Sequence, residues 1–149
     1  MAVEARPKGE VVTLKTPLLS NGRTTSFIVQ TDLLGVAVKV YAEGGENVIH
    51  AHAREEHMFL VLAGQATFHL GKEERAQVVN RFEGVLLPAK AYYWFQSSGD
   101  RNLVMVRVGA RYPGEKAGRL TPDGRDIPGD SPENKQVPRI ERPGKWFGA

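Results

Sequence analysis

Short apolar runs separated by turn residues dominate the chain from about residue 11 to residue 108. The runs are rich in Val, Leu, Ile, Phe and Tyr, and the breaks between them include Asn21-Gly22, Gly44-Gly45 and Ser98-Gly99-Asp100. This spacing is typical of β-strands joined by tight turns. The candidate strands are residues 25–31, 36–41, 48–52, 57–62, 66–70, 78–80, 84–87, 92–96 and 103–108.

The same pattern predicts an all-β fold. No stretch combines a long 3.6-residue apolar period with a helix cap. Many short strands at regular spacing favour a single antiparallel β-barrel or a jelly roll. We therefore expect residues 1–112 to form one β-barrel domain, with its core in residues 36–108 and a short N-terminal arm before it.

The composition changes in residues 113–149, which hold six of the nine prolines and six of the sixteen glycines. Proline removes a backbone donor and glycine loses more entropy on ordering, so this tail is expected to be irregular. It nevertheless ends in Trp146-Phe147, and apolar groups favour burial. We expect the tail to pack on the barrel or on a partner subunit.

Composition narrows the chemistry. The chain has 149 residues, 41% hydrophobic and 25% charged, which fits one globular domain. It has no cysteine, so disulfides and thiolate metal sites are excluded and any metal must be held by nitrogen and oxygen.

The net charge is +3, and basic residues are interleaved with acidic ones, so we expect no nucleic-acid partner. With no signal-like N-terminus and no apolar run of membrane-spanning length, a cytoplasmic protein without a membrane partner is expected.

Three of the four histidines, His50, His52 and His57, fall within eight residues. Imidazole is a common ligand for transition metals. Residues two apart in a strand point to the same face, so His50 and His52 can converge on one ion. Residues 53–56 are long enough for a hairpin turn, after which a neighbouring antiparallel strand would bring His57 to the same site. The cluster predicts a three-histidine metal centre.

Alternation leaves the register of the returning strand open. Either His57 or Glu56 faces inward, and the residues that follow on each face are apolar in both cases. Glu56 is accordingly a candidate ligand if a bulge shifts the register, or a carboxylate that accepts an imidazole N–H.

The spacing of this segment resembles a known family. Gly44, His50, His52, His57 and Gly64 follow the pattern G-x5-H-x-H-x4-H-x6-G, which is similar to the first motif of the cupin superfamily, G-x5-H-x-H-x3-4-E-x6-G. His57 stands where cupins usually carry glutamate. The resemblance is that of a small single-domain cupin with an atypical metal motif.

A second cupin motif is matched more loosely from Gly84 to Ser97, with Pro88 in its typical place and Tyr93 where a histidine ligand would be. The resemblance covers roughly residues 36–108. It implies a jelly-roll barrel that binds a divalent transition metal (Fe, Zn, Mn or Ni) and forms a homodimer. Tyr93 is then a phenolate ligand, a hydrogen-bond donor or general acid beside the metal, or a packing residue, of which the last two are favoured.

Three functions are compatible with such a site. The first is a small-molecule dioxygenase, by resemblance to three-histidine cupin enzymes that use iron(II). The second is a metal-dependent lyase, cyclase or isomerase in which Tyr93 or Glu56 moves a proton. The third is a non-catalytic domain that binds or senses a small molecule. Arg81, Lys90 and Arg107 are candidate contacts for an anionic substrate or solvated surface charges, and the sequence does not identify the substrate.

Overall fold

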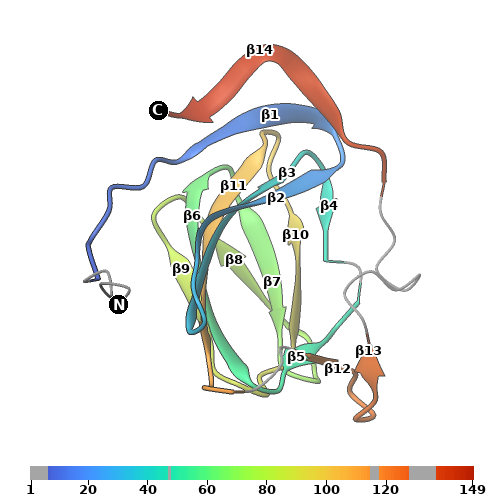
Figure 1. Cartoon of the computed structure of the whole chain (residues 1–149). Helices are drawn as coiled ribbons and strands as arrows, with labels where there is room; N and C mark the ends of the chain where they lie inside the picture. Colours follow the sequence, from blue (N-terminus) through green and yellow to red (C-terminus); the bar gives the residue numbers. More distant parts are fainter. Residues whose placement is uncertain (1–6, 47, 115–117, 128–136) are drawn as a thin grey trace, which may run out of the picture.

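The protein is a sandwich of antiparallel β-sheets (Figure 1), seen in a computed structural model that describes residues 7–46, 48–114, 118–127 and 137–149. The largest sheet has five strands in the order β2-β3-β11-β6-β9. Its strands are β2 (Arg23–Gln30), β3 (Leu34–Tyr41), β11 (Leu103–Arg111), β6 (Glu55–Ala63) and β9 (Gly84–Leu87).

A four-stranded sheet faces it, in the order β4-β10-β7-β8. Its strands are β4 (Gly44–Gly45), β10 (Tyr93–Ser97), β7 (Ala66–Leu70) and β8 (Arg75–Val79). A smaller sheet at one end joins β5 (Ala51–His52), β12 (Arg119–Leu120) and β13 (Asp126–Ile127). The all-β prediction is confirmed, although the two large sheets form a sandwich and do not close into a barrel.

The main core lies between the two large sheets. Alternate residues of facing strands meet there and are almost fully buried, among them Tyr41, Phe59, Phe68, Phe95 and Met105. The aromatic rings contact one another edge-on or tilted, for example Phe59 and Phe68 with centroids 5.4 Å apart. Burying such large rings provides most of the apolar contact that holds the sheets together.

A second core lies on the outer face of the five-stranded sheet. Val38, Val40 and Val104 face this side, and Leu19 of β1 (Lys15–Asn21) packs on them. β1 pairs with β14 (Ile140–Gly148), and the two strands form a ribbon across the top of the sandwich in Figure 1. Because this ribbon covers it, β3 is buried on both faces, which explains why its sequence is almost continuously apolar.

The tail is more regular than its composition predicts. Its described residues include three strands, β12, β13 and β14, and Phe147 packs against the second core. β14 accommodates Pro143 and Gly144 because the pairing with β1 shifts register between Glu141 and Trp146. A proline at such a bulge breaks no ladder hydrogen bond. In the part of the chain that the structure describes, no helix could span a membrane.

Candidate metal centre

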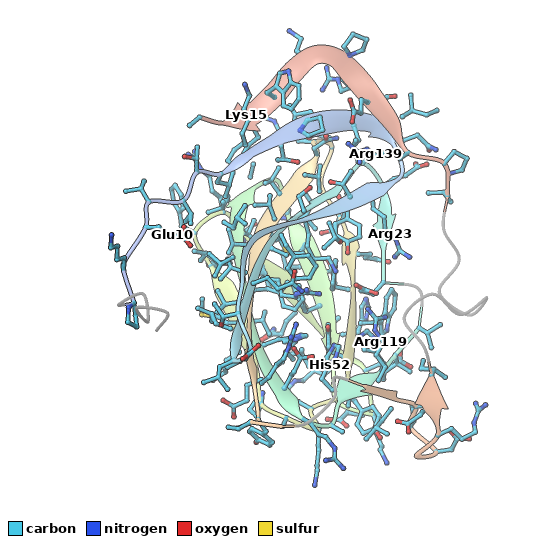
Figure 2. The ribbon with its side chains drawn as sticks, viewed as in Figure 1. Glu10, Lys15, Arg23, His52, Arg119 and Arg139 are labelled. Atoms are coloured by element: carbon cyan, nitrogen blue, oxygen red, sulfur yellow. The ribbon has the colours of Figure 1, made fainter. Side chains whose placement is uncertain are left out.

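The segment that carries His50 and His52 enters the interior at the end of the sandwich opposite the β1–β14 ribbon. His50 forms a β-bridge with Tyr93, and β5 then pairs with β12, with His52 opposite Arg119. Figure 2 shows His52 and Arg119 together at this end, far from Lys15. The predicted β5–β6 hairpin is wrong, because β6 lies between β11 and β9. The turn thus carries the chain from one sheet to another.

β6 presents alternate residues to the interior. Glu55 is 8% exposed and His57 is 3% exposed, whereas Glu56 is exposed on the opposite face, where it pairs with Ala110. The regular alternation places His57 inward, and the inward carboxylate is Glu55 rather than Glu56. Sequence reasoning missed Glu55, although its position two residues before His57 puts both on one face of a strand.

His52, Glu55 and His57 form a compact donor cluster. One potential ligand atom from each lies within 4.8 Å of the others. Glu55 Oε2 is 3.7 Å from His57 Nε2, and the ring centroids of His52 and His57 are 4.1 Å apart. Glu55 also accepts a hydrogen bond from Arg111 Nε at 3.3 Å. This separation of nitrogen and oxygen donors fits a single transition-metal ion.

His50 adds a fourth donor beside this cluster. Its ring centroid is 5.1 Å from that of His52. Its Nδ1 is 2.8 Å from the carbonyl oxygen of Val48, an acceptor, so Nδ1 carries the proton and Nε2 has a free lone pair. His50 Nε2 is buried without a partner among the described residues. Buried nitrogens of this kind normally have a partner, and a metal ion would supply one.

Burial keeps these imidazoles neutral. It lowers the pKa of His50 to about 4, with nearby Arg119 as a further cause. Burial also lowers the pKa of His52 and of His57. The neighbouring His57, and after it Arg111, lower the pKa of the Glu55 carboxyl. Neutral imidazoles and an ionised carboxylate are the protonation states that bind metal, so the donor set fits a divalent transition metal.

Tyr93 lies beside the cluster in β10. It is 2% exposed, and its hydroxyl is 3.3 Å from His52 Nε2. Burial and the nearby Glu46 raise the pKa of this phenol. The neutral hydroxyl can therefore hold a proton next to His52, which agrees better with a hydrogen-bonding or packing role than with a phenolate ligand.

Gly109 leaves room for His57. The two residues are directly paired across β11 and β6, and a Cβ at position 109 would lie 3.2 Å from His57 Cδ2 and 3.3 Å from Nε2. Gly109→Ala should therefore push the imidazole by a few tenths of an ångström and lower metal affinity about 10-fold, as loss of an orienting contact does. A competition titration measures this, with Gly35→Ala, whose Cβ has ordinary space, as control. Unchanged affinity in Gly109→Ala would contradict it.

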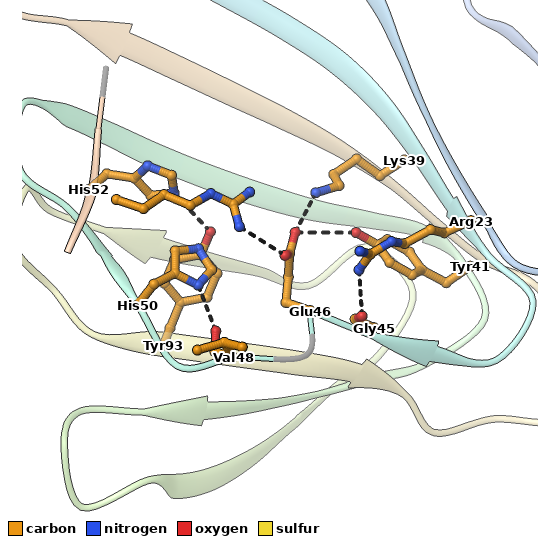
Figure 3. A network of polar contacts seen from close by, with 10 residues as sticks. Arg23, Lys39, Tyr41, Gly45, Glu46, Val48, His50, His52 and Tyr93 are labelled. Atoms are coloured by element: carbon orange, nitrogen blue, oxygen red, sulfur yellow. Dashed lines mark hydrogen bonds and ion pairs between the residues drawn. The ribbon is translucent and has the colours of Figure 1, made fainter. Parts of the chain in front are cut away.

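A cavity of about 230 Å³ lies on the side of β2 and β3, and its wall residue Arg119 is paired with His52 of the cluster. It is lined by Arg23, Thr25, Phe27, Lys39, Tyr41, Glu46, Arg107 and Arg119. In its wall, Glu46 accepts hydrogen bonds from Lys39 Nζ at 2.8 Å and from Arg119 at 3.4 Å (Figure 3). Figure 3 shows Glu46 between Lys39 and the His50–Tyr93 pair. These hydrogen bonds join Lys39 and Arg119 through Glu46 in the cavity wall.

The other charged candidates of the sequence lie elsewhere. Arg81 and Lys90 are exposed, and Arg81 contacts the ring of Phe82. The fourth histidine of the chain, His69 on β7, lies outside the cluster and stacks on Trp94 with ring centroids 3.9 Å apart. Sequence reasoning missed Lys39 and Glu46, because each is a single charged residue with nothing in its local pattern to mark it as buried.

These features define a class: an antiparallel β-sandwich with a histidine and carboxylate cluster in its interior. Residues 37–109 match the family model of the Cupin domain. The chain belongs to the cupin superfamily, as the resemblance of its motifs implies. None of the curated proteins matches the chain.

Solved structures share this fold at low sequence identity. One similar structure is an uncharacterized conserved protein with a double-stranded beta-helix domain from Klebsiella pneumoniae. Its TM-score is 0.57 at 18% identity, and the match covers 66% of this chain and 84% of the Klebsiella chain. A cupin superfamily protein from Desulfitobacterium hafniense has a TM-score of 0.54 at 14% identity, covering 62% and 80%. An oxalate oxidase has a TM-score of 0.53 at 19% identity, covering 61% and 52%. These likenesses show the fold alone.

Proposed function

We propose that this protein is a metal-dependent enzyme acting on a small molecule, most simply an iron(II) dioxygenase. The observation that carries the proposal is the His52, Glu55 and His57 cluster, with donor atoms within 4.8 Å of one another. Two histidines and one carboxylate, with other positions left open, are typical of non-haem iron(II) oxygenases. The oxalate oxidase among the similar folds is compatible with redox chemistry in this architecture.

The proposed ligand set differs from three histidines alone. Glu55 adds a negative charge, so a divalent ion held by His52, Glu55 and His57 has a lower net charge than one held by imidazoles only. His50 is a further donor through its unpartnered Nε2. A bound metal would supply a Lewis acid or a redox centre at this position.

The surrounding residues would keep the reaction centre dry and provide a proton. Phe59 and Phe68 pack around Tyr93 and are fully buried, so they exclude water from the inner side of the site. The Tyr93 hydroxyl, 3.3 Å from His52 Nε2, keeps its proton because burial raises its pKa. The position of this hydroxyl beside His52 is the observation that favours a second candidate, a metal-dependent lyase or isomerase in which Tyr93 transfers a proton.

Metal content and oxygen consumption test these proposals. Protein purified without added metal should contain about one equivalent of iron, zinc, manganese or nickel per chain, and His52→Ala should lose it. With iron(II) and a panel of thiols, diketones and small organic acids, an oxygen electrode should record substrate-dependent uptake. If the protein binds metal but consumes no oxygen, the dioxygenase proposal is ruled out and the lyase or isomerase proposal is retained. Metal content far below one equivalent, unchanged in His52→Ala, would overturn both and favour a binding domain.

A further inference from the structure

The cavity beside the metal centre is strongly basic. Four of its wall residues are cationic, Arg23, Lys39, Arg107 and Arg119, and one is acidic, Glu46. The whole chain has a net charge of only +3. Positive charge is thus concentrated around one small volume, where low-dielectric walls strengthen its effect on a ligand.

Glu46 is already occupied by two of these cations. Its Oε1 accepts the hydrogen bond from Lys39, and its Oε2 accepts the bond from Arg119. The Tyr41 hydroxyl also donates to Oε1, at 3.5 Å. Arg23 donates to the backbone carbonyl of Gly45 at 2.7 Å. Both carboxylate oxygens of Glu46 are thus engaged by Lys39 and Arg119, and neither pairs with Arg107.

Arg107, another cation of the wall, lies on β11. Its directly paired residue on β6 is Phe59, which points inward, so the two side chains share the interior face. Arg107 Nε is buried without a hydrogen-bond partner, and no ion pair joins Arg107 to another residue that the structure describes. Its guanidinium lies 5.5 Å from the centroid of the Phe27 ring. A guanidinium with unused donors in a cavity wall can bind an anion.

We propose that the cavity binds a small organic acid and that Arg107 holds its carboxylate. The planar guanidinium matches a carboxylate through two parallel hydrogen bonds, and the ring of Phe27 keeps it oriented. Lys39 and Arg119 add positive charge to the same cavity. This inference rests on the proposed function, because it names the substrate class of that site.

The position of Arg107 suits a substrate that also reaches the metal. Arg107 is paired with Phe59, and two residues further along the same strands Gly109 is paired with His57. Arg107 and His57 are therefore diagonal neighbours across the two strands. Diagonal neighbours of this kind have Cα atoms about 7–8 Å apart. An acid anchored on Arg107 can therefore extend a second polar group toward the histidines. The cavity of about 230 Å³ is smaller than the range of about 300–1,000 Å³ usual for drug-sized ligands, so the acid must be small.

Calorimetric titration of metal-free protein with malonate and succinate tests the proposal, with inorganic phosphate and the neutral malonamide as further probes. One of the dicarboxylates should bind and malonamide should not. Arg107→Met should weaken binding about 10- to 100-fold, because a bidentate charged contact is lost. Arg107→Lys should weaken binding less, because lysine keeps the positive charge but cannot form the two parallel hydrogen bonds of a guanidinium. The control is Arg81→Met, which removes an exposed arginine outside the cavity and should bind normally.

The inference would be overturned by no binding of either dicarboxylate, by equal binding of malonamide, or by unchanged affinity in Arg107→Met. Binding of phosphate alone would also overturn it, by assigning the cavity to phosphate. Circular dichroism and metal content of each variant show whether the fold and the metal centre are intact. The titration uses metal-free protein, so acid binding and metal binding are measured separately. If the protein binds metal but no acid, the proposed substrate class is refuted and the proposed metal-dependent enzyme is not. If it binds acid but no metal, the proposed metal-dependent enzyme is refuted and the acid site is not.

Discussion

Replacing Glu55 with glutamine should lower the affinity of the protein for a divalent transition metal by more than about 100-fold. Glu55 offers an oxygen within 4.8 Å of donor atoms of His52 and His57. Glutamine keeps the size of the side chain but removes the negative charge that binds the ion. Side chains that merely orient a ligand contribute about 10- to 100-fold to metal affinity, so loss of a ligand should cost more. Competition with a chromogenic zinc chelator measures the change.

Glu56→Gln is the matched control. It makes the same chemical change one residue along the same strand, at an exposed position on the opposite face. Its metal affinity should stay within about twofold of the unchanged protein, as expected for a surface substitution. Equal losses in both variants, or a loss in Glu56→Gln alone, would mean that the register of β6 at the metal centre is different. Far-UV circular dichroism establishes that both variants fold.

Glu46→Gln should destabilise the protein by about 3–5 kcal/mol at pH 7. Lys39 and Glu46 are each only 4% exposed, and their charged atoms are 2.8 Å apart. Removing the carboxylate charge leaves the Lys39 ammonium buried with Arg107 and Arg119 as its charged neighbours. An uncompensated buried charge is among the most costly defects of a folded protein. Urea unfolding curves give the change in the free energy of unfolding.

The loss in Glu46→Gln should shrink as the pH rises. In the intact protein, burial lowers the pKa of Lys39 from 10.5 to about 8. Between these values the unfolded chain binds more protons at this lysine, so stability rises with pH. Without Glu46, which raises this pKa, the value falls further and the same gain begins at lower pH. The substitution should therefore cost most below pH 7 and least near pH 9.

The double variant Lys39→Met/Glu46→Gln provides the control for this interpretation. It removes the buried ammonium together with its partner, so it should be more stable than Glu46→Gln alone and lack the alkaline gain in stability. If the double variant were as unstable as the single one, the cost would not come from the charge of Lys39. Glu43→Gln, at a nearby exposed carboxylate, should change stability by less than about 0.5 kcal/mol.

Local pattern was sufficient to predict the strands. Every candidate segment overlaps an observed strand, because alternation and turn residues depend only on near neighbours along the chain. The glycines that frame the first motif illustrate the local signal: Gly44 and Gly64 have φ values of +69° and +77°, which favour glycine. The β1–β14 ribbon escaped prediction because its paired residues are 119 or more positions apart, and neither strand has a clear alternation of its own.

The choice between His57 and Glu56 as the inward residue depended on the outer layer of the fold. β6 is apolar on both faces because Leu62 packs against the second core under the ribbon, while Phe59 packs in the main core. Alternation within the strand could not say which face was interior. The pairing of β6 with β11 and β9 places His57 and Glu55 inside, and this pairing depends on residues distant in sequence.

The sequence by itself determined the β architecture, the absence of thiolate ligands and the grouping of His50, His52 and His57, because each follows from composition or from spacing within one segment. Only the tertiary structure brought Glu55 to the histidines and put Lys39, Glu46 and Arg107 around one cavity. Those residues lie on different strands, and nothing in their local sequence records which faces meet. Burial and charge pairing are set by long-range packing, and the chemistry proposed for this cupin depends on both.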